Sequence, residues 1–314
     1  MTDRPEMFEG VEEIWMDGEF VDFEDAQVHV LTHALHYGTG VFEGVRCYDT
    51  ENGPAIFRWD EHLDRFYASG EPYNLDIPFD REELTEATKE LIRRQDLESC
   101  YIRPVAYYGY DMLGLNPESC PEQVAIAVWP WGAYLGEEAL EEGVEVTVSS
   151  WRKYASSQIP TNAKTTGPYV NSVLASLEAK REGYVEAILL NQEGNIAEGP
   201  GENLFLVRDG EIYTPGLAEG ILDGITRNTV ITLARERGYT VHDDATISRG
   251  ELNTADELFF SGTAAEVTPI RKVDNVVIGE GTRGPVTTDL QQAFFELVER
   301  RTDDHAEWFD YVEA

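Results

Sequence analysis

The chain has 314 residues, 42% of them hydrophobic and 11% aromatic, which supplies core for one large domain or two modest ones and excludes a disordered chain. It carries 60 acidic residues against 24 lysines and arginines, a net charge of −36, so binding to the polyanionic backbone of a nucleic acid is not expected. No apolar run is long enough to span a bilayer and no signal-like segment opens the sequence, so we predict a cytoplasmic protein without a membrane partner.

Strands and helices are mixed in the N-terminal half of the chain. An alternating segment around Asp17-Gly18 predicts a hairpin, and Asp80 with Glu83 predicts the capping box of a helix. In chain order we expect a hairpin at 13–23, a strand at 55–59, helices at 60–75 and 79–97, and strands at 101–110 and 123–131.

The pattern breaks at residues 129–143, where proline and glycines predict a connection between two domains. Beyond it, Pro168 and Gly183 bracket a predicted helix, and Asp209-Gly210 marks a hairpin turn. We expect a strand at 144–151, a helix at 168–183, a strand at 186–191, a hairpin at 203–215, a helix at 224–238, and a strand followed by a turn within 257–270. The elements predict two α/β domains with much antiparallel sheet.

Lys164 is one of only five lysines, and its neighbours are small residues followed by Gly167-Pro168, with no acidic residue near it in sequence. An uncharged lysine amine is a nucleophile toward aldehydes, and burial or nearby cations favour that form. The alternative is an ordinary solvated lysine, because most lysines are solvated.

Glu198 lies in "IAEGPGENLF", after a predicted strand and before glycines that permit a tight turn. A carboxylate at this point could meet a cationic ring nitrogen. The alternative is that Glu198 and Glu202 are solvated turn residues of an acid-rich chain.

Two turns and one cation could bind an anion. Residues 224–226 begin a predicted helix, where unpaired N–H groups and the helix dipole favour phosphate, and residues 262–264 form a turn that can do the same. Arg65, on the helix after "DEH", is a candidate fixed cation. The alternatives are ordinary helix caps and a solvated arginine.

The histidines and cysteines do not predict a metal site. His33 and His36 are three residues apart and lack a third ligand, so core or turn histidines are the better interpretation. Three cysteines, Cys47, Cys100 and Cys120, are odd in number and not spaced like metal ligands, which favours free thiols.

Several aromatic side chains could line an apolar pocket, although core packing is the usual role of such residues. The candidates are Tyr37, Phe42, Tyr101, Trp131, Tyr134 and Tyr169.

Taken together, these segments resemble one enzyme family. The pattern E-x-x-x-x-N-L-F runs from Glu198 to Phe205, Thr214 follows, and L-x-G-I-x-R runs from Leu222 to Arg227. This order is similar to the signature of the fold-type IV pyridoxal-phosphate enzymes. Within that family, "HALHYGTGVFEGVRCY", "YIRP", "PWGAYLG", "SGTAAE" and "GPVT…QQAFF" resemble bacterial branched-chain amino acid aminotransferases over nearly the whole chain.

The resemblance implies an α+β fold like that of D-amino acid aminotransferase. It implies a small N-terminal α/β domain over residues 1–129, an interdomain loop at 130–137, and a larger C-terminal domain with an antiparallel-rich sheet over 138–314. A homodimer would be the minimal unit, with a trimer of dimers as a common larger assembly.

For the cofactor, pyridoxal 5'-phosphate, the resemblance implies that Lys164 binds the aldehyde and then carries the proton of the reaction. Glu198 would meet the pyridine nitrogen, and Tyr169 the phenolate oxygen. Leu222 would pack against the ring. The phosphate would be held by Arg65, Ile225, Thr226 and Thr263. No metal is implied.

For the substrate, the resemblance implies that Tyr101 and the backbone of Thr263 and Ala264 meet the α-carboxylate. Arg103 would meet the distal carboxylate of glutamate. The side-chain pocket would be formed by Phe42, Trp131, Tyr134 and Tyr169, with Tyr37 contributed by the partner subunit.

The chain departs from the family pattern at two points near the cofactor. Asp223 stands where a proline is expected in "LPGITR", and "TTGPY" follows Lys164 where relatives often have "AGGNY". These departures bear on phosphate binding and on substrate preference.

The resemblance implies reversible transamination of L-leucine, L-isoleucine and L-valine with 2-oxoglutarate, within branched-chain amino acid biosynthesis or degradation. D-amino acid aminotransferase and aminodeoxychorismate lyase are alternatives that would keep the cofactor residues; "YIRP" and "PWGAYLG" argue against both. A non-catalytic binding or structural protein is a further alternative, which would not require Lys164, Glu198 and Arg65 together.

The acidic residues are spread along the chain, so they do not form an acidic tail. In dilute salt such a surface repels itself, whereas molar salt shortens the screening length to about 3 Å. We therefore predict a halophilic protein; the alternative is an ordinary acidic protein.

This interpretation predicts that the protein unfolds when it is desalted. Circular dichroism and intrinsic fluorescence during dialysis from molar salt to a dilute buffer measure the transition, and restoring the salt is the control for reversibility. A fold that is indifferent to salt would contradict a halophilic origin.

Overall fold

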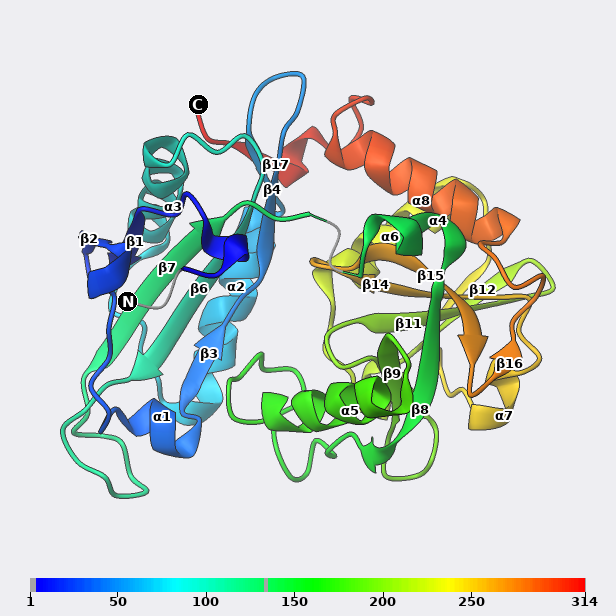
Figure 1. The fold of residues 1–314 in the computed structure, drawn as a ribbon, viewed down its shortest axis with the longest axis horizontal. Coiled ribbons are helices and arrows are strands. Elements are labelled where there is room, and N and C mark those ends of the chain that lie inside the picture. The colour runs from blue at the N-terminus through cyan, green and yellow to red at the C-terminus, as the bar shows by residue number, and fades with distance from the viewer. Residues whose placement is uncertain (1–3, 133–134, 314) are drawn as a thin grey trace. The chain divides into compact units, whose positions relative to one another are not determined.

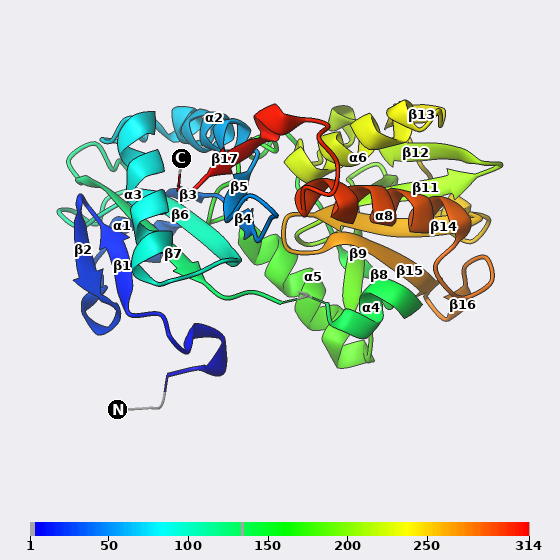
Figure 2. The same ribbon diagram turned by 90° about the horizontal axis from the view of Figure 1, so that it is seen from above.

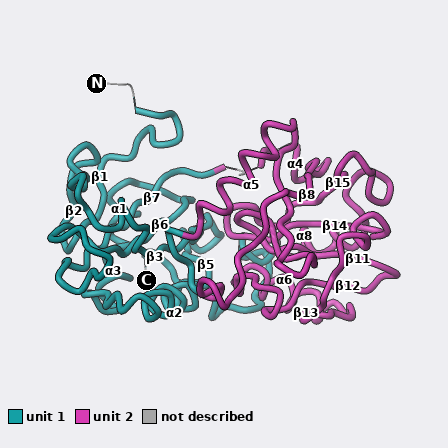
Figure 3. Tube along the Cα trace, turned by 90° about the horizontal axis from the view of Figure 1, so that it is seen from below, with its two compact units in different colours: residues 1–131, 163–167, 297–314 teal, residues 132–162, 168–296 magenta. Residues whose placement is uncertain are grey.

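The computed structural model describes residues 4–132 and 135–313. The chain divides into two compact units (Figure 3). Unit 1 comprises residues 1–131, 163–167 and 297–314, and unit 2 comprises residues 132–162 and 168–296. These units follow spatial packing, so each draws on segments that are separated in sequence. The domain boundaries predicted above were placed at single breaks in the sequence. They put residues 163–167 and 297–314 in the C-terminal domain, whereas these residues pack in unit 1.

Unit 1 is built on a sheet with strand order β17-β5-β4-β6-β7-β1-β2, and β3 pairs with β6 off this path (Figure 1). The strands are β1 Glu13–Met16, β2 Glu19–Asp22, β3 Gly40–Phe42, β4 Val45–Tyr48, β5 Ala55–Phe57, β6 Cys100–Tyr108, β7 Glu122–Trp129 and β17 Phe309–Tyr311. The helices are α1 His33–Tyr37, α2 Trp59–Gly70 and α3 Arg81–Arg94. Helices α2 and α3 lie along this sheet (Figure 2).

The sequence patterns explain these elements. Asp17 and Gly18 both have positive φ, as a two-residue hairpin requires, and they join β1 to β2. The predicted capping box is present at α3, where the Asp80 carboxylate accepts from the Glu83 N–H and the Glu83 carboxylate accepts from the Asp80 N–H. Leu84 and Leu91 of α3 enter the same core as Leu63 of α2, which fixes both helices on the sheet.

Unit 2 is built on a second sheet with strand order β10-β9-β8-β15-β14-β11-β12-β13, and β16 pairs with β15. Its strands are β8 Val144–Arg152, β9 Glu186–Leu190, β10 Ile196–Glu198, β11 Asn203–Arg208, β12 Glu211–Pro215, β13 Val241–Ala245, β14 Glu257–Gly262, β15 Glu266–Val273 and β16 Val276–Val277. The helices are α4 Glu137–Glu142, α5 Tyr169–Glu182, α6 Ile225–Glu236, α7 Arg249–Leu252 and α8, which begins at Pro285 and ends at Val298 in unit 1. Antiparallel pairs dominate, with parallel pairs between β8 and β9, β8 and β15, and β12 and β13.

In three parts of the chain the sequence patterns did not predict the secondary structure. Residues 33–48 form α1, β3 and β4, which are too short to show a clear period. Residues 285–298 form α8. The sequence analysis used part of this segment, "GPVT…QQAFF", as a family motif but did not predict a helix there. The segment after β14 was predicted as a turn, but it continues beyond that turn as the buried strand β15. A strand that is buried on both faces does not alternate, so its pattern does not distinguish it from its surroundings.

Among the described residues, no helix is both long and apolar enough to cross a membrane.

The segment 163–167 is held on β3 of unit 1. The Lys164 carbonyl accepts from the Phe42 N–H at 3.0 Å, and the Thr166 N–H donates to the Gly40 carbonyl at 2.8 Å. Val41 and Thr165 face each other as an antiparallel bridge. Because these bonds run along the backbone, they fix the position of Lys164 in unit 1 irrespective of its side chain.

Gly38 and Gly167 make this docking possible. The Gly167 N–H donates to the Gly38 carbonyl at 3.1 Å, and a Cβ atom on Gly38 would overlap with the Gly167 Cα. Gly38 also ends α1 with a φ of 66°, in the left-handed region. Gly38 therefore meets both a conformational and a steric requirement for glycine.

We predict that Gly38→Ala destabilises the protein by roughly 3 kcal/mol or more, because about 1 kcal/mol of left-handed strain is added to a backbone overlap. Gly183→Ala is the matched control. Gly183 also ends a helix with positive φ, but nothing lies within 4 Å of its Cβ position, so only the strain of about 1 kcal/mol is expected. Denaturant unfolding in molar salt measures the free energy of unfolding of both variants. Equal losses of stability would show that the close approach of Gly38 to Gly167 does not matter.

Candidate active site

Lys164 lies beside aromatic and polar side chains of unit 1. Its backbone N–H donates to the Ser69 hydroxyl of α2 at 2.9 Å, and its Nζ lies 5.2 Å from the centre of the Phe42 ring. The positive charge of Lys164 also contributes to lowering the pKa of His62, so these two groups are electrostatic neighbours. The predicted nucleophile therefore lies next to the predicted pocket residue Phe42.

Arg65 is held by a carboxylate that the sequence analysis did not select. Its Nε donates to Glu43 Oε1 at 2.6 Å and its Nη2 to Glu43 Oε2 at 2.9 Å, and His62 Nδ1 donates to the same Oε2 at 2.8 Å. Glu43 is fully buried. The only signal in the sequence was an acidic residue between two short apolar runs, in "VFEGV".

The charges of this group are strongly shifted by burial and by one another. Burial raises the pKa of Glu43, but the positive charge and hydrogen bonds of Arg65 and the contact with His62 outweigh it and hold the pKa well below its usual range. Burial lowers the pKa of His62, and the charges of Arg65 and Lys164 add to this effect against the opposing influence of Glu43. Glu43 is therefore a carboxylate beside a neutral imidazole.

The predicted substrate residues of unit 1 form a group. Arg103 Nη2 donates to the Tyr101 hydroxyl at 3.1 Å, and its guanidinium lies 4.8 Å from the centre of the Phe42 ring. Tyr101 packs against Trp131 at 4.9 Å between ring centres. Tyr37 lies apart from this group on α1, exposed, with its hydroxyl donating to the Leu113 carbonyl at 3.3 Å. Tyr134 lies outside the described residues.

In unit 2, Glu198 ends β10 and is 5% exposed, so the alternative of a solvated turn residue is wrong. Lys153 Nζ donates to its Oε1 at 2.5 Å, and the Leu222 N–H donates to its Oε2 at 2.9 Å. Asn203 Nδ2 donates to the same Oε2 at 3.3 Å and to the Leu222 carbonyl at 3.0 Å. Lys153 and Asn203 were not selected as site residues, although Asn203 is part of the quoted pattern.

Lys153 is a cation because of this carboxylate. Burial lowers the pKa of Lys153, but the negative charge of Glu198 outweighs it and raises the pKa above its usual value, with Tyr154 and Tyr169 acting in the same direction. Lys153 therefore contacts Glu198 as a cation, and the two buried groups form an ion pair. Tyr169, the first residue of α5, lies in the electrostatic environment of this pair.

Helix α6 begins at Ile225, three residues after Leu222. Gly224 is its N-cap residue, and Ile225 and Thr226 are the first two helical residues, at the end of the helix where the dipole favours an anion. A Cβ on Gly224 would overlap with the Asn203 side chain, so the approach of this turn to Asn203 requires glycine. Asn203 therefore connects Glu198 to the start of α6.

The remaining predicted residues lie in turns. Thr263 and Ala264 connect β14 to β15, in a turn closed by the pairing of Gly262 with Glu266. Asp223, which departs from the family pattern, is largely exposed and lies 3.8 Å from Arg227 one helical turn later. Its carboxylate thus has a local ionic partner in the buried guanidinium of Arg227.

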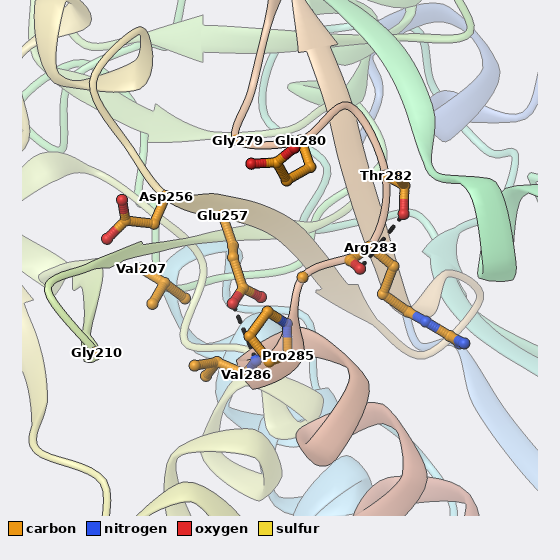
Figure 4. A pocket seen from close by; sticks show the side chains of 11 residues that line it. Val207, Gly210, Asp256, Glu257, Gly279, Glu280, Thr282, Arg283, Pro285 and Val286 are labelled. Atoms are coloured by element: carbon orange, nitrogen blue, oxygen red, sulfur yellow. Dashed lines mark hydrogen bonds between the residues drawn. The ribbon is translucent and has the colours of Figure 1, made fainter.

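A cavity of about 450 Å³ in unit 2 is lined by none of the predicted site residues (Figure 4). Glu257 on its wall accepts from the N–H groups of Val286 and Thr287 at 2.9 and 2.7 Å. This buried carboxylate therefore caps the N-terminus of α8, which is a structural role. Within the described ranges, no group of three or more histidine, cysteine or acidic side chains could hold a metal ion.

Each unit by itself offers groups that suit part of a phosphorylated pyridine aldehyde. Unit 1 offers an amine at Lys164 and a cation at Arg65. Unit 2 offers the buried carboxylate of Glu198 for a protonated ring nitrogen and the N-terminus of the twelve-residue helix α6 for a phosphate.

Comparisons with known proteins agree on one family. The family model of amino-transferase class IV matches residues 40–273 of this chain. The chain is 52% identical to the branched-chain-amino-acid aminotransferase of Pseudomonas aeruginosa over 295 residues, which cover 94% of this chain and 95% of that protein.

Solved structures agree with this result. The branched-chain amino acid aminotransferase of Escherichia coli is similar with a TM-score of 0.94 and 49% identity, covering 96% of this chain and 99% of that one. The T.th. branched-chain amino acid aminotransferase, solved with pyridoxamine 5'-phosphate, is similar with a TM-score of 0.93 and 50% identity. The match covers 96% of this chain and 99% of that one.

Proposed function

Since the chain belongs to the amino-transferase class IV family, with the fold-type IV architecture, we propose that it transfers amino groups reversibly between L-leucine, L-isoleucine or L-valine and 2-oxoglutarate. The products would be branched-chain 2-oxo acids and L-glutamate. The observation that carries this proposal is the 52% identity to a branched-chain-amino-acid aminotransferase over nearly the full length of both chains. The grouping of Phe42, Tyr101, Trp131 and Arg103 in unit 1 is a further observation in its support.

The cofactor of the proposed reaction is pyridoxal 5'-phosphate, in keeping with the pyridoxamine 5'-phosphate of the T.th. structure. When bound, it supplies an aldehyde that exchanges amino groups and a ring that withdraws electrons from the substrate Cα. Lys164 is proposed to bind the aldehyde, and Glu198 to accept a hydrogen bond from the ring N–H. The Lys153 cation, 2.5 Å from Glu198, holds the carboxylate in place for this role.

The other cofactor residues would orient the ring and its phosphate. We assign the phosphate to Arg65, to the N–H groups of Ile225 and Thr226, and to Thr263, because cations and helix N-termini both favour anions. Tyr169 would donate to the phenolate oxygen and Leu222 would pack on the ring. The Lys164 amine, when not bound to the aldehyde, would hold and move the proton of the substrate Cα.

The substrate pocket of the proposal combines aromatic walls with one cation. Phe42, Tyr101 and Trp131 provide apolar surface, and Arg103 lies over the Phe42 ring with a hydrogen bond to Tyr101. An apolar side chain can contact the rings, whereas the distal carboxylate of glutamate can pair with Arg103. This arrangement suits two substrates that differ in polarity. We assign the α-carboxylate to Tyr101 and to the turn at Thr263 and Ala264.

An exposed apolar surface supports a homodimer. It is formed by two segments of unit 1 that hydrogen bonds join, since His33 donates its N–H to the Gly109 carbonyl at 2.9 Å and its Nε2 contacts the Gly114 carbonyl at 2.7 Å. Its exposed members are Val28, Val30, Leu31, Leu35, Tyr37, Tyr110, Met112, Leu113 and Leu115. Such a surface on a highly charged protein indicates a partner, and we propose a second copy of the chain, with Tyr37 reaching the partner's site.

Unit 2 carries an apolar stripe of its own. Val170, Val173 and Leu177 follow one face of α5 at helical spacing and are exposed. A second such surface fits an assembly larger than a dimer, for which we propose a trimer of dimers. We also propose that the enzyme works in a cytoplasm of high salt.

The reaction is tested by following the visible absorption of the protein loaded with pyridoxal 5'-phosphate in molar salt. L-leucine and L-glutamate are each expected to change the spectrum, and the matching 2-oxo acid is expected to restore it. D-alanine and aminodeoxychorismate should have no effect. A response to D-alanine alone would indicate a D-amino acid aminotransferase, and turnover of aminodeoxychorismate alone would indicate a lyase.

Arg103→Met provides the test of dual specificity within the same assay. The variant should lose roughly a hundredfold in kcat/KM for 2-oxoglutarate, because a charge-assisted pair is removed, while kcat/KM for L-leucine changes by only a few-fold. A uniform loss for both substrates would contradict the role given to Arg103.

The dimer is tested by replacing Leu35 and Leu115 together with glutamine. Each buried leucine contributes about 1.5 kcal/mol or more, so the double variant should raise the dimer dissociation constant at least about a hundredfold in sedimentation analysis at molar salt. The matched control is the double variant of Val276 and Val277 to glutamine, which alters exposed apolar residues of β16 in unit 2. Unchanged association of the leucine variant would exclude this surface as the interface.

A further inference from the structure

Glu43 is a fully buried carboxylate next to Arg65, and nothing in the reaction proposed above uses it. We propose that Glu43, supported by His62, is a positioning residue that fixes the guanidinium of Arg65 for the phosphate of the cofactor. This inference rests on the proposed function, which assigns Arg65 to that phosphate.

The contact between the two side chains fixes an orientation. Arg65 donates from Nε at 2.6 Å and from Nη2 at 2.9 Å to the two different oxygens of Glu43. A guanidinium is planar and has five N–H donors, so a two-point contact through one edge determines where the donors of the other edge point. A single hydrogen bond would leave rotation about its axis. The carboxylate therefore sets the direction in which Arg65 can meet an anion.

Glu43 is itself immobilised from several directions. Its backbone N–H donates to the Pro104 carbonyl at 2.9 Å, which ties it to β6. Its Oε2 accepts from His62 Nδ1 at 2.8 Å and from the Gly44 N–H at 3.2 Å. With the bonds from Arg65, both oxygens are engaged, so the carboxylate has little freedom to turn.

One face of α2 joins this group to Lys164. His62, Arg65 and Ser69 are separated by three and four residues, so they lie along one side of the helix. The first two bind Glu43, and the Ser69 hydroxyl accepts from the Lys164 N–H at 2.9 Å. The same helical face thus positions both the cation assigned to the phosphate and the backbone of the nucleophile.

Stability alone does not account for the pair. Removing two charges from water is costly, and buried ion pairs are often replaceable by apolar residues without loss of stability. Burial also disfavours the charged form of Glu43, and the carboxylate persists because Arg65 and His62 stabilise it. A fixed orientation of Arg65 is a function that an apolar pair could not supply.

A role of Glu43 through its charge and a role through the orientation of Arg65 predict opposite changes in phosphate binding, which makes the inference testable. Glu43 places a negative charge close to a site assigned to an anion. If its charge were all that mattered, neutralising Glu43 would strengthen the binding of phosphate. If its role is to orient Arg65, neutralising it would weaken the binding of phosphate despite the more positive potential.

The experiment uses Glu43→Gln, which keeps the size of the side chain but removes one acceptor and the charge. Apoprotein in molar salt is titrated with pyridoxal 5'-phosphate and, separately, with pyridoxal, which has the same aldehyde and ring but no phosphate. We expect the affinity for pyridoxal 5'-phosphate to fall about tenfold and that for pyridoxal to change less than about threefold. Inhibition of cofactor binding by inorganic phosphate should weaken in parallel.

Two further variants separate the possible causes. Glu257→Gln is the matched control, since Glu257 is a buried carboxylate that caps α8, and the ratio of the two affinities should not change. In the background of Arg65→Met, Glu43→Gln should have no further effect on this ratio, because a positioning residue acts only through the residue that it positions.

The outcomes distinguish the inference from the function on which it rests. If Arg65→Met does not weaken pyridoxal 5'-phosphate more than pyridoxal, the assignment of Arg65 to the phosphate is wrong. If Arg65→Met is selective but Glu43→Gln leaves the affinity for pyridoxal 5'-phosphate unchanged or raises it, the role of Glu43 is overturned. Should Glu43→Gln fail to fold, His62→Phe removes one donor to Glu43, and a selective loss for the phosphorylated compound is expected there too; its absence overturns the inference.

Discussion

The backbone docking of residues 163–167 on β3 is the constraint on which the site of unit 1 depends. These five residues come from a stretch of chain whose neighbours on both sides belong to unit 2, yet their hydrogen bonds run to β3 and α2. Gly38 and Gly167 allow the two backbones to approach, and the Ser69 hydroxyl meets the Lys164 N–H. The backbone of Lys164 is therefore positioned by contacts that do not depend on its side chain.

Buried carboxylates have three different roles in a chain with a large excess of acid. Glu257 caps α8 through backbone N–H groups, Glu198 pairs with Lys153 and the Leu222 N–H, and Glu43 binds Arg65 and His62. Each has its oxygens engaged by donors, as burial of a charge requires. The net charge does not reveal these residues, because a carboxylate that performs a specific task is a small minority among 60 acidic residues. The hydrogen-bond donors around a buried acidic side chain therefore indicate its role better than its charge does.

Local signals predicted the local structure well. The hairpin at Asp17-Gly18, the capping box at Asp80 and the turn at Asp209-Gly210 are all present, because turn and cap chemistry depends on a few adjacent residues. The resemblance gave the family, which the comparisons confirm. Glu43 and Lys153 escaped prediction because their partners are 22 and 45 residues away in sequence. Pairing across such distances is decided by the tertiary fold, which no pattern in a single sequence displays.

The net charge bears on the proposed association of two copies of the chain. Two copies with a net charge of −36 each repel one another strongly in dilute salt, whereas exposed leucine, valine and tyrosine side chains of unit 1 favour association by leaving water. Salt weakens the repulsion over any distance beyond about 3 Å at 1 M but leaves the apolar contribution in place. The balance between the two therefore shifts toward association as salt rises. If the partner subunit supplies Tyr37 to the pocket, the salt dependence of activity would follow from assembly as well as from the fold of the single chain.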